Sequence, residues 1–491
     1  MKDLKEKTIR GGSARVAALA TNFLLRVGSL AVLARLLDPK DFGLLGMVTA
    51  FTGVLSLFRD FGLSAAAIQQ SEITEEQSST LFWINILVGA GLTAIAISLA
   101  PVVAMLYHEP RLLWITSVVA IGFLVNGAGV QHSTILQRQM HFTTLAFIEV
   151  GSLIISASIA IGAAVAGYGY WALVGMTVCV PLTATLGFWL ASGWIPGAPR
   201  RGIGIRSMMR FGGTLTLNGL VLYVASNFEK VLLGRFWGAE SLGIYGRAYQ
   251  LIRIPTDNLN SAVGEVAFSA LSRIQDDRSR LRSYFLKGYS LVLGFTVSIT
   301  TACALFADDI VIVLLGPKWK EAAPIFRLLA PTMLIFAITN PLGWLLNSLG
   351  LVGRGLKIAL VIAPLMVASY FVGLPYGPKG VAFAYSAVTM LWVVPVIAWA
   401  VHGTAISFRD VLRVTSPLLA SIIPAAGLGF GIHLFVQTGP PLLRLFVETL
   451  VLFSTYFGVL LFVAGQKLLY LDLLRGFTRS SSVKQKSLVS V

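Results

Sequence analysis

The chain of 491 residues is 56% hydrophobic and only 12% charged. A soluble domain normally carries about 25% charged residues, so this composition excludes an ordinary soluble protein and indicates a chain that lies largely in lipid. The formal net charge of +16 does not indicate a nucleic-acid-binding face, because the basic residues are scattered over short polar segments instead of being clustered.

Apolar stretches of about 20 residues recur along the whole chain, and this is the length that a helix needs to cross a hydrocarbon core of about 30 Å. We therefore predict an all-α polytopic membrane protein with about fourteen transmembrane helices. In chain order, the predicted spans are 13–36, 42–69, 80–101, 112–136, 143–166, 169–191, 208–235, 243–271, 288–307, 322–349, 358–373, 379–401, 414–436 and 445–465.

The orientation follows from the lysines and arginines, which remain on the cytoplasmic side. With the N-terminus inside, the predicted inner segments hold 22 of the 38 basic residues and the outer segments only 6. The inner segment QSEITEEQ, residues 70–77, has no basic residue, so the orientation depends on the total. We predict a multi-pass membrane protein with both termini in the cytoplasm.

A spaced pattern occurs twice in the chain. Residues 34–46 read ARLLDPKDFGLLG and residues 234–246 read GRFWGAESLGIYG. The two copies share an arginine and two glycines, which are Arg35 with Arg235, Gly43 with Gly243, and Gly46 with Gly246. Three identities are weak support for a repeat, so further landmarks are needed.

Two other pairs of segments recur in the same order. The end of the third span, APVVAMLYHEP at 100–110, resembles ADDIVIVLLGPKW at 307–319. The start of the sixth span, GYGYWALVG at 167–175, resembles YGPKGVAFAYSAV at 376–388. These spacings predict two diverged halves of six helices, and an even number of spans per half makes the repeat parallel.

The repeat divides the chain into four predicted parts. They are an N-terminal six-helix lobe at 1–200, a C-terminal six-helix lobe at 201–405, two additional transmembrane helices at 406–465, and a basic cytoplasmic tail at 466–491. Transporters built from such repeats hold their substrate between the halves and expose it to each side in turn.

Basic residues inside the predicted spans are the first candidates for substrate binding, because a charge within the membrane needs a partner or a water-filled cavity. Five of them follow one another in depth along the first, second, seventh and eighth spans. These candidates are Arg26, Arg59, Lys230, Arg247 and Arg253. Structural pairing is the alternative, for instance between Arg253 and Asp257 at i, i+4.

Acidic residues in the same regions are candidates for coupling transport to an ion. Asp60 is adjacent to Arg59, Glu229 is adjacent to Lys230, and Glu149 stands alone in the fifth span. Asp257 lies one turn from Arg253. Each of these carboxylates could pair with a cation between substrates, or bind a proton.

Several chemistries find no support in the sequence. The five histidines, His108, His132, His141, His402 and His433, show no metal-ligand spacing. No P-loop is present, and no polar region is large enough for a nucleotide-hydrolysing domain. We predict no catalytic residue, no metal, no cofactor and no nucleic-acid partner. The energy for transport should come from a gradient, from the membrane potential or from the substrate's own concentration difference.

Three segments near the N-terminus resemble a known family. RLLDPKDFGLLGMV at 35–48, RDFGLSAAAIQ at 59–69 and TLFWIN at 80–85, with LGPKW at 315–319, are similar to Wzx-type polysaccharide exporters, particularly the WzxC-like branch. These exporters belong to the multidrug, oligosaccharidyl-lipid and polysaccharide exporter superfamily. The resemblance implies a V-shaped pair of six-helix lobes with two extra C-terminal helices.

The resemblance also implies a function. It implies a flippase that moves a polysaccharide or a polyprenyl-pyrophosphate-linked oligosaccharide across the bacterial inner membrane, beside the enzymes that make that polysaccharide. In related lipid II flippases, cavity arginines on the first, second and eighth helices matter, and Arg26, Arg59 and Arg253 stand on the corresponding helices here.

Two alternatives remain open. A drug antiporter of the same superfamily would bind cations and would favour an acidic cavity. A membrane polysaccharide polymerase or glycosyltransferase would be expected to show a large outer loop or a soluble catalytic domain. The excess of basic residues within the spans and the short outer connections favour the exporter over both.

Overall fold

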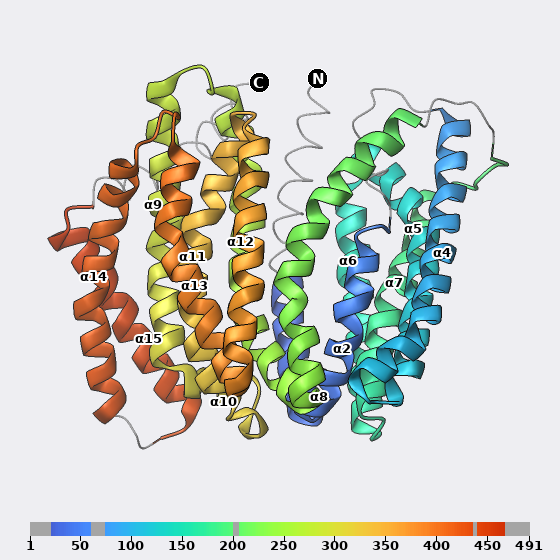
Figure 1. Ribbon diagram of the computed structural model, residues 1–491, viewed down its shortest axis with the longest axis horizontal. Helices are drawn as coiled ribbons and strands as arrows, with labels where there is room; N and C mark the ends of the chain where they lie inside the picture. Colours follow the sequence, from blue (N-terminus) through green and yellow to red (C-terminus); the bar gives the residue numbers. More distant parts are fainter. Residues whose placement is uncertain (1–20, 60–73, 200–205, 436–438, 467–491) are drawn as a thin grey trace, which may run out of the picture. The chain divides into compact units, whose positions relative to one another are not determined.

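The computed structural model describes residues 21–59, 74–199, 206–435 and 439–466, apart from some side chains between 206 and 270, and this part of the chain is helical with no strand (Figure 1). The prediction of an all-α protein is therefore confirmed. The helices are residues 21–36, α2 (Pro39–Ser56), α4 (Glu75–Tyr107), α5 (Arg111–Arg138), α6 (Phe142–Val165), α7 (Tyr170–Ser192), α8 (Arg206–Arg273), α9 (Arg278–Leu305), α10 (Ala307–Leu314), α11 (Ala322–Ser348), α12 (Val352–Gly373), α13 (Gly377–Val401), α14 (Phe408–Phe435) and α15 (Pro441–Gly458), which a π-helical turn (Val459–Val463) follows.

The helices have the length and the surface of membrane spans. Nine described helical segments are long and apolar enough to cross a bilayer, and one of these, Val352–Val401, contains both α12 and α13. Large apolar side chains stand on their outer surfaces, and Leu87, Phe147 and Leu391 keep 70%, 75% and 78% of their area exposed. Such a surface suits lipid and not water. The chain is a multi-pass membrane protein, and the count of fourteen spans stays a prediction.

Local sequence signals explain where several helices begin. The hydroxyl of Thr74 accepts a hydrogen bond from the backbone N–H of Gln77 at 3.2 Å, and the Gln77 side chain accepts one from the Thr74 N–H at 3.0 Å. This capping box starts α4 earlier than the predicted span at residue 80. At α9, the carboxylate of Asp277 accepts from the backbone N–H groups of Ser279 and Arg280.

The seventh and eighth predicted spans join in one long element that is interrupted at a glycine. α8 comprises 68 residues, and at Gly238 the backbone has φ 80° and ψ 179°. An unbroken helix of that length would extend about 100 Å, several times the hydrocarbon thickness. The positive φ, which favours glycine, ends the first arm, and the second arm starts at Ala239.

The described helices group into two compact units. Unit 1 comprises Met1–Gln250, Leu314–Ala322 and Ala359–Tyr385, and unit 2 comprises Leu251–Val313, Ala323–Ile358 and Ser386–Val491. In unit 1, α4 packs on α5, and α7 packs on both α5 and α6. In unit 2, buried side chains of α9, α11, α13, α14 and α15 form one core. The lobe boundaries at residues 200 and 405 stay predictions.

Candidate functional site

The two copies of the repeated pattern break the helix at the same position. In the first copy, the helix over 21–36 ends, Asp38 has extended backbone angles, and α2 begins at Pro39. In the second copy, α8 is interrupted at Gly238 and continues from Ala239. Positions 38 and 238 are related by the offset of the sequence repeat, so the sequence pattern has a structural counterpart in a helix break.

The two copies also pack against each other within unit 1, in an arrangement that we name the motif crossing (residues 34–46 and 234–246). A Cβ atom added to Gly43 would overlap the backbone carbonyl of Ala239, and one added to Gly243 would overlap the carbonyl of Pro39. Residue 43 therefore meets 239 while its counterpart 243 meets 39. This reciprocal pairing is the signature of an isologous contact about a twofold axis. Glycine is required at both positions because the backbones approach so closely.

Aromatic residues from the ends of the third and ninth spans pack on the motif crossing. The indole N–H of Trp319 donates to the carbonyl of Ala34 at 2.7 Å, and its ring lies 5.3 Å, edge to face, from that of Phe42. In the other copy, a Cβ on Gly234 would collide with the ring of Tyr107. Positions 34 and 234 are again counterparts, so one aromatic residue from each segment of the second repeat landmark contacts the motif crossing within unit 1.

Of the candidate cations, Arg247 lies at this crossing. Its guanidinium stands over the ring of Phe42, 4.5 Å from the centroid, and donates to the Gln250 side chain. Its Nε atom is buried, with no hydrogen-bond partner among the described residues. A guanidinium that lies over an aromatic face and is shielded from water makes a strong cation–π contact. This contact links the eighth predicted span to the second.

Three further candidate cations in unit 1 have different surroundings. Arg26 is exposed on the helix over 21–36. Arg59 is exposed just beyond α2, where its guanidinium donates to the Oδ1 atom of Asn126 at 3.4 Å. Lys230 is half-buried in α8 and donates to the Oδ1 atom of Asn227 at 2.7 Å. Arg26 and Arg59 thus keep guanidinium surface that a ligand can reach.

The fifth candidate cation, Arg253, is half-buried in the part of α8 that belongs to unit 2. Thr256 lies one turn further along the helix and lines a small pocket of unit 2 together with Thr296, Asn340 and Trp344. Residues at i and i+3 share a helix face, so Arg253 lies on the same side of α8 as this pocket.

The candidate coupling residues are only partly described. Glu229 is buried, with 1% of its area exposed, and lies within electrostatic reach of Tyr245, Tyr370 and Tyr385 in unit 1. Glu149 is half-buried in α6. Asp60 lies outside the described residues, and the structure does not describe the side chain of Asp257.

The hydroxyl groups of the second predicted span form their hydrogen bonds within α2 itself. The hydroxyls of Thr49, Thr52 and Ser56 donate to backbone carbonyls three or four residues earlier in α2, at 2.9 to 3.1 Å. Such bonds meet the needs of a hydroxyl without any water. These three hydroxyls therefore do not by themselves require a water-filled cavity beside α2.

One ionisable cluster escaped the sequence analysis. Asp309 of α10, His433 of α14, and Arg444 and Glu448 of α15 come together in unit 2. Their spacing along the chain has no recognisable pattern, because three separate helices contribute. The available signal was Arg444 and Glu448 at i, i+4 within the apolar run PLLRLFVETL, since charged residues within a membrane span are functional candidates by default.

Comparison with known proteins places this architecture in a family. A model of the family described as "Polysaccharide biosynthesis protein" matches residues 32–324, more than half of the chain. The chain is 29% identical over 329 residues to the teichuronic acid biosynthesis protein TuaB of Bacillus subtilis (strain 168), covering 67% of this chain and 68% of that protein. It is 26% identical over 378 residues to the lipopolysaccharide biosynthesis protein WzxC of Escherichia coli (strain K12), covering 75% and 76%.

Solved structures share the fold at low sequence identity. The lipid II flippase MurJ in an inward closed conformation matches with a TM-score of 0.72 at 15% identity, over 95% of this chain and 100% of that one. An inward-facing multidrug resistance transporter of the MATE family matches with a TM-score of 0.61 at 14% identity, over 83% and 98%. The resemblance to Wzx-type proteins is confirmed: this chain belongs to the polysaccharide biosynthesis protein family, and it has the fold of the MurJ and MATE transporters.

Proposed function

We propose that this chain is a transporter that moves a polysaccharide or a polyprenyl-pyrophosphate-linked oligosaccharide across the bacterial inner membrane by alternating access. The family match is the observation that carries the proposal, because it extends over 32–324 and includes both copies of the repeated pattern. A further relative is the succinoglycan biosynthesis transport protein ExoT of Rhizobium meliloti (strain 1021). The two sequences are 23% identical over a region that covers 68% of this chain and 67% of ExoT.

The candidate cations suit an anionic headgroup. A guanidinium binds two phosphate oxygens in a planar fork, and its affinity is greatest where water is scarce. We assign substrate binding to Arg26, Arg59, Lys230, Arg247 and Arg253. The exposure of Arg26 and Arg59 supports this assignment, whereas the contacts of Arg247 with Phe42 and Gln250 also fit a structural role.

Coupling to an ion is assigned to the acidic residues of the same spans, which are Asp60, Glu149, Glu229 and Asp257. The burial of Glu229 supports its candidacy, because a buried carboxyl group responds strongly to a nearby proton or cation. No catalytic step is part of this proposal. Both termini lie in the cytoplasm, and the enzymes that synthesise the polysaccharide are the expected neighbours.

Transport of a labelled lipid-linked oligosaccharide into proteoliposomes tests the proposal. We expect Arg26→Ala and Arg253→Ala to lower the rate by about 100-fold, a factor worth about 2.7 kcal/mol, at unchanged protein level. Lysine should restore the rate only in part, because it keeps the charge but loses the fork. The control is Arg413→Ala, which changes an exposed arginine of α14. Parental protein that moves cationic drugs and no lipid-linked sugar would instead indicate an antiporter.

A further inference from the structure

The ionisable cluster of unit 2 is almost enclosed. Asp309 and Glu448 have side chains with 0% of their area exposed, Arg444 retains 19% and His433 retains 27%. One ligand atom each of Asp309, His433 and Glu448 all lie within 4.8 Å of one another. Four ionisable side chains within an apolar helix packing are costly unless their charges are balanced and hydrogen-bonded.

Two pairs make up the cluster. The guanidinium of Arg444 binds both carboxylate oxygens of Asp309. Its Nε donates to Oδ2 at 2.8 Å, and its Nη2 donates to Oδ1. The Nδ1 atom of His433 lies 2.8 Å from the Oε1 atom of Glu448. The second carboxylate oxygen of Glu448, Oε2, is buried and has no hydrogen-bond partner among the described residues. A buried carboxylate oxygen without a donor makes the second pair the sensitive part of the cluster.

The charges of the cluster balance only when one proton is bound. Arg444 and Asp309 cancel, so a neutral imidazole leaves the Glu448 carboxylate with a net charge of minus one in an enclosed site. A single proton shared by His433 and Glu448 brings the sum to zero. Asp308 of α10 also acts electrostatically on Arg444, and it forms a separate, exposed pair with Arg327 of α11 at 2.6 Å, whose charges cancel. Because an unbalanced buried charge is strongly disfavoured, this site favours the bound proton.

We propose that His433 and Glu448, balanced by Arg444 and Asp309, form a proton-binding site at the end of the α14–α15 pair. A metal ion is the alternative ligand for such a set of atoms. It is disfavoured because Arg444 already occupies both oxygens of Asp309 and supplies positive charge where a cation would sit.

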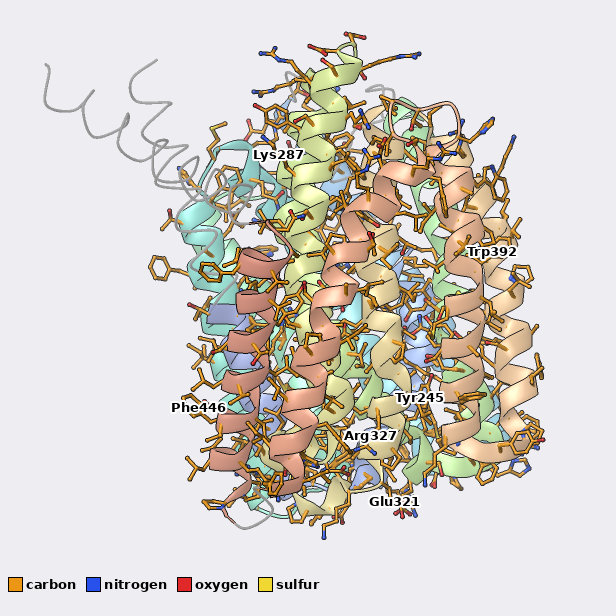
Figure 2. All side chains as sticks on the ribbon, turned by 90° about the vertical axis from the view of Figure 1, so that its left-hand side faces the viewer. Tyr245, Lys287, Glu321, Arg327, Trp392 and Phe446 are labelled. Atoms are coloured by element: carbon orange, nitrogen blue, oxygen red, sulfur yellow. The ribbon has the colours of Figure 1, made fainter. Side chains whose placement is uncertain are left out.

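The position of the site gives the proton a route and a consequence. His433 lies two residues before the end of α14, and Glu448 lies two turns into α15, so the partly exposed imidazole is close to the membrane surface. On α15, Phe446 points outward with 64% of its area exposed (Figure 2), which places lipid-facing and enclosed residues on opposite sides of one helix. Loss of the proton leaves a bare carboxylate between α14 and α15 and weakens their packing.

The proton site also deepens the proposed function and, in this respect, rests on it. In the predicted orientation, the end of α14 is the outer end, so protons from the outer compartment would reach His433. Binding of the proton would tighten the last helix pair on α10, and release would loosen it. Transport would then depend on the outer pH through α14 and α15, two helices that lie outside the repeat.

Proton binding can be measured without transport, as the thermal midpoint of the purified full-length protein in detergent between about pH 5.5 and pH 8.5. We expect the parental midpoint to fall by about 5 °C as the proton leaves at higher pH. In Glu448→Gln the imidazole has no carboxylate to balance it and should stay neutral, so the midpoint should become flat over this range. His433→Gln leaves the enclosed Glu448 as the group that takes up the proton alone, so its midpoint should still depend on pH, but over a different pH range from the parent; this variant serves if Glu448→Gln does not fold.

Asp410→Asn is the matched control, because Asp410 is a buried carboxylate of α14 that pairs with Arg282 and has no histidine partner. This variant should have a lower midpoint but the parental dependence on pH. A parental profile in both site variants overturns the proton site. A midpoint that zinc raises in the parent but not in Glu448→Gln also overturns it, in favour of a metal site.

The coupling to transport has its own measurement in proteoliposomes with and without an imposed pH gradient. The parent should respond to the gradient, and Glu448→Gln should lose the part of this response that depends on the proton site, so its response should be smaller than that of the parent. A full gradient response in Glu448→Gln would refute the link between the site and transport. A parent that moves no substrate at all would refute the proposed function, while the thermal profiles would still decide whether the proton site exists.

Discussion

Gly43 lies so close to the backbone carbonyl of Ala239 that no side-chain carbon fits between them, and its counterpart Gly243 has the same relationship with Pro39. Two segments separated by two hundred residues therefore touch through their backbones. The contact needs a glycine on each side, which explains why the glycine at this position is kept in both copies of a pattern that has otherwise diverged.

The first prediction concerns these glycines. Gly43→Ala and Gly243→Ala should each destabilise the protein by about 1–3 kcal/mol, because an added methyl group forces a packed backbone apart. Gly246→Ala is the matched control, since this motif glycine has open space around its Cα and alanine favours a helix. Thermal midpoints in detergent measure the loss of stability in each variant. Equal midpoints for all three variants would show that the two backbones of the motif crossing can move apart without destabilising the protein.

The second prediction concerns Trp319, which is fully buried and donates its indole N–H to Ala34. Trp319→Phe should cost about 1–3 kcal/mol, because the buried carbonyl of Ala34 loses its donor. Trp237→Phe provides the comparison: this indole donates to the Leu374 carbonyl in the same way, at 2.9 Å, but the side chain is 44% exposed. Water can replace the donor there, so the Trp237 variant should retain more of the parental stability in the same thermal assay.

Much of the fold was predictable because hydropathy reports burial in lipid directly. The span over 112–136 matches α5 within two residues, and the offset of the repeat matches the helix breaks at Asp38 and Gly238. What hydropathy misses are short polar segments that continue a helix. α9 starts ten residues before its predicted span because Asp277 caps a charged first turn. The eight-residue helix α10 was not foreseen, since it is too short to give a periodic signal.

The candidate site was less predictable, because a sequence shows which charges lie in a span but not what they contact. The sequence singles out Arg247 as a cation within a predicted span, but only the structure reveals Phe42 beneath its guanidinium. His433 and Glu448 were passed over as a site because their partners come from other helices. A spacing rule detects ligands within one element, whereas this cluster is assembled by tertiary packing.

The third prediction separates a substrate role from a structural role for Arg59. Its contact with Asn126 is long, at 3.4 Å, and exposed, so it should add no more than about 1 kcal/mol to stability. Asn126→Ala should therefore leave both stability and transport nearly unchanged. Arg59→Ala should lower transport at least tenfold if its guanidinium meets the substrate. Equal transport by the two variants and the parent in proteoliposomes would remove Arg59 from the substrate path.

The fourth prediction concerns pH and the connection between α4 and α5. The Arg111 guanidinium binds both oxygens of Glu109, each at 2.7 Å, and holds the pKa of this carboxyl below its ordinary value. A carboxyl group whose pKa is lowered by folding stabilises the protein above its unfolded pKa and loses that contribution as the pH falls through the folded pKa. Glu109→Gln should be slightly less stable than the parent near neutrality, by no more than about 1 kcal/mol because the pair is partly exposed.

In acid the two proteins should converge, because the parental Glu109 is then protonated and has lost its ion pair. Thermal midpoints of the parent and of Glu109→Gln, taken from neutral pH down to about pH 3.5, measure this convergence. A difference that grows as the pH falls would have the wrong sign for an ion pair of this kind.

The last prediction concerns orientation, which depends on the excess of lysine and arginine in the predicted inner segments. Reporter fusions at residue 5 and after residue 480 should both be cytoplasmic. The predicted outer connection at 102–111 needs adjustment as a fusion site, because α4 continues to Tyr107 and α5 starts at Arg111. A reporter inserted between His108 and Pro110 avoids both helices and should be periplasmic. If that reporter is cytoplasmic while residue 5 is also cytoplasmic, the number of spans before α4 is wrong. A periplasmic reporter after residue 480, with residue 5 in the cytoplasm, would instead mean that the chain has an odd number of spans. If the extra or missing span lies before α14, the His433–Glu448 site would then lie at the membrane face opposite the predicted one.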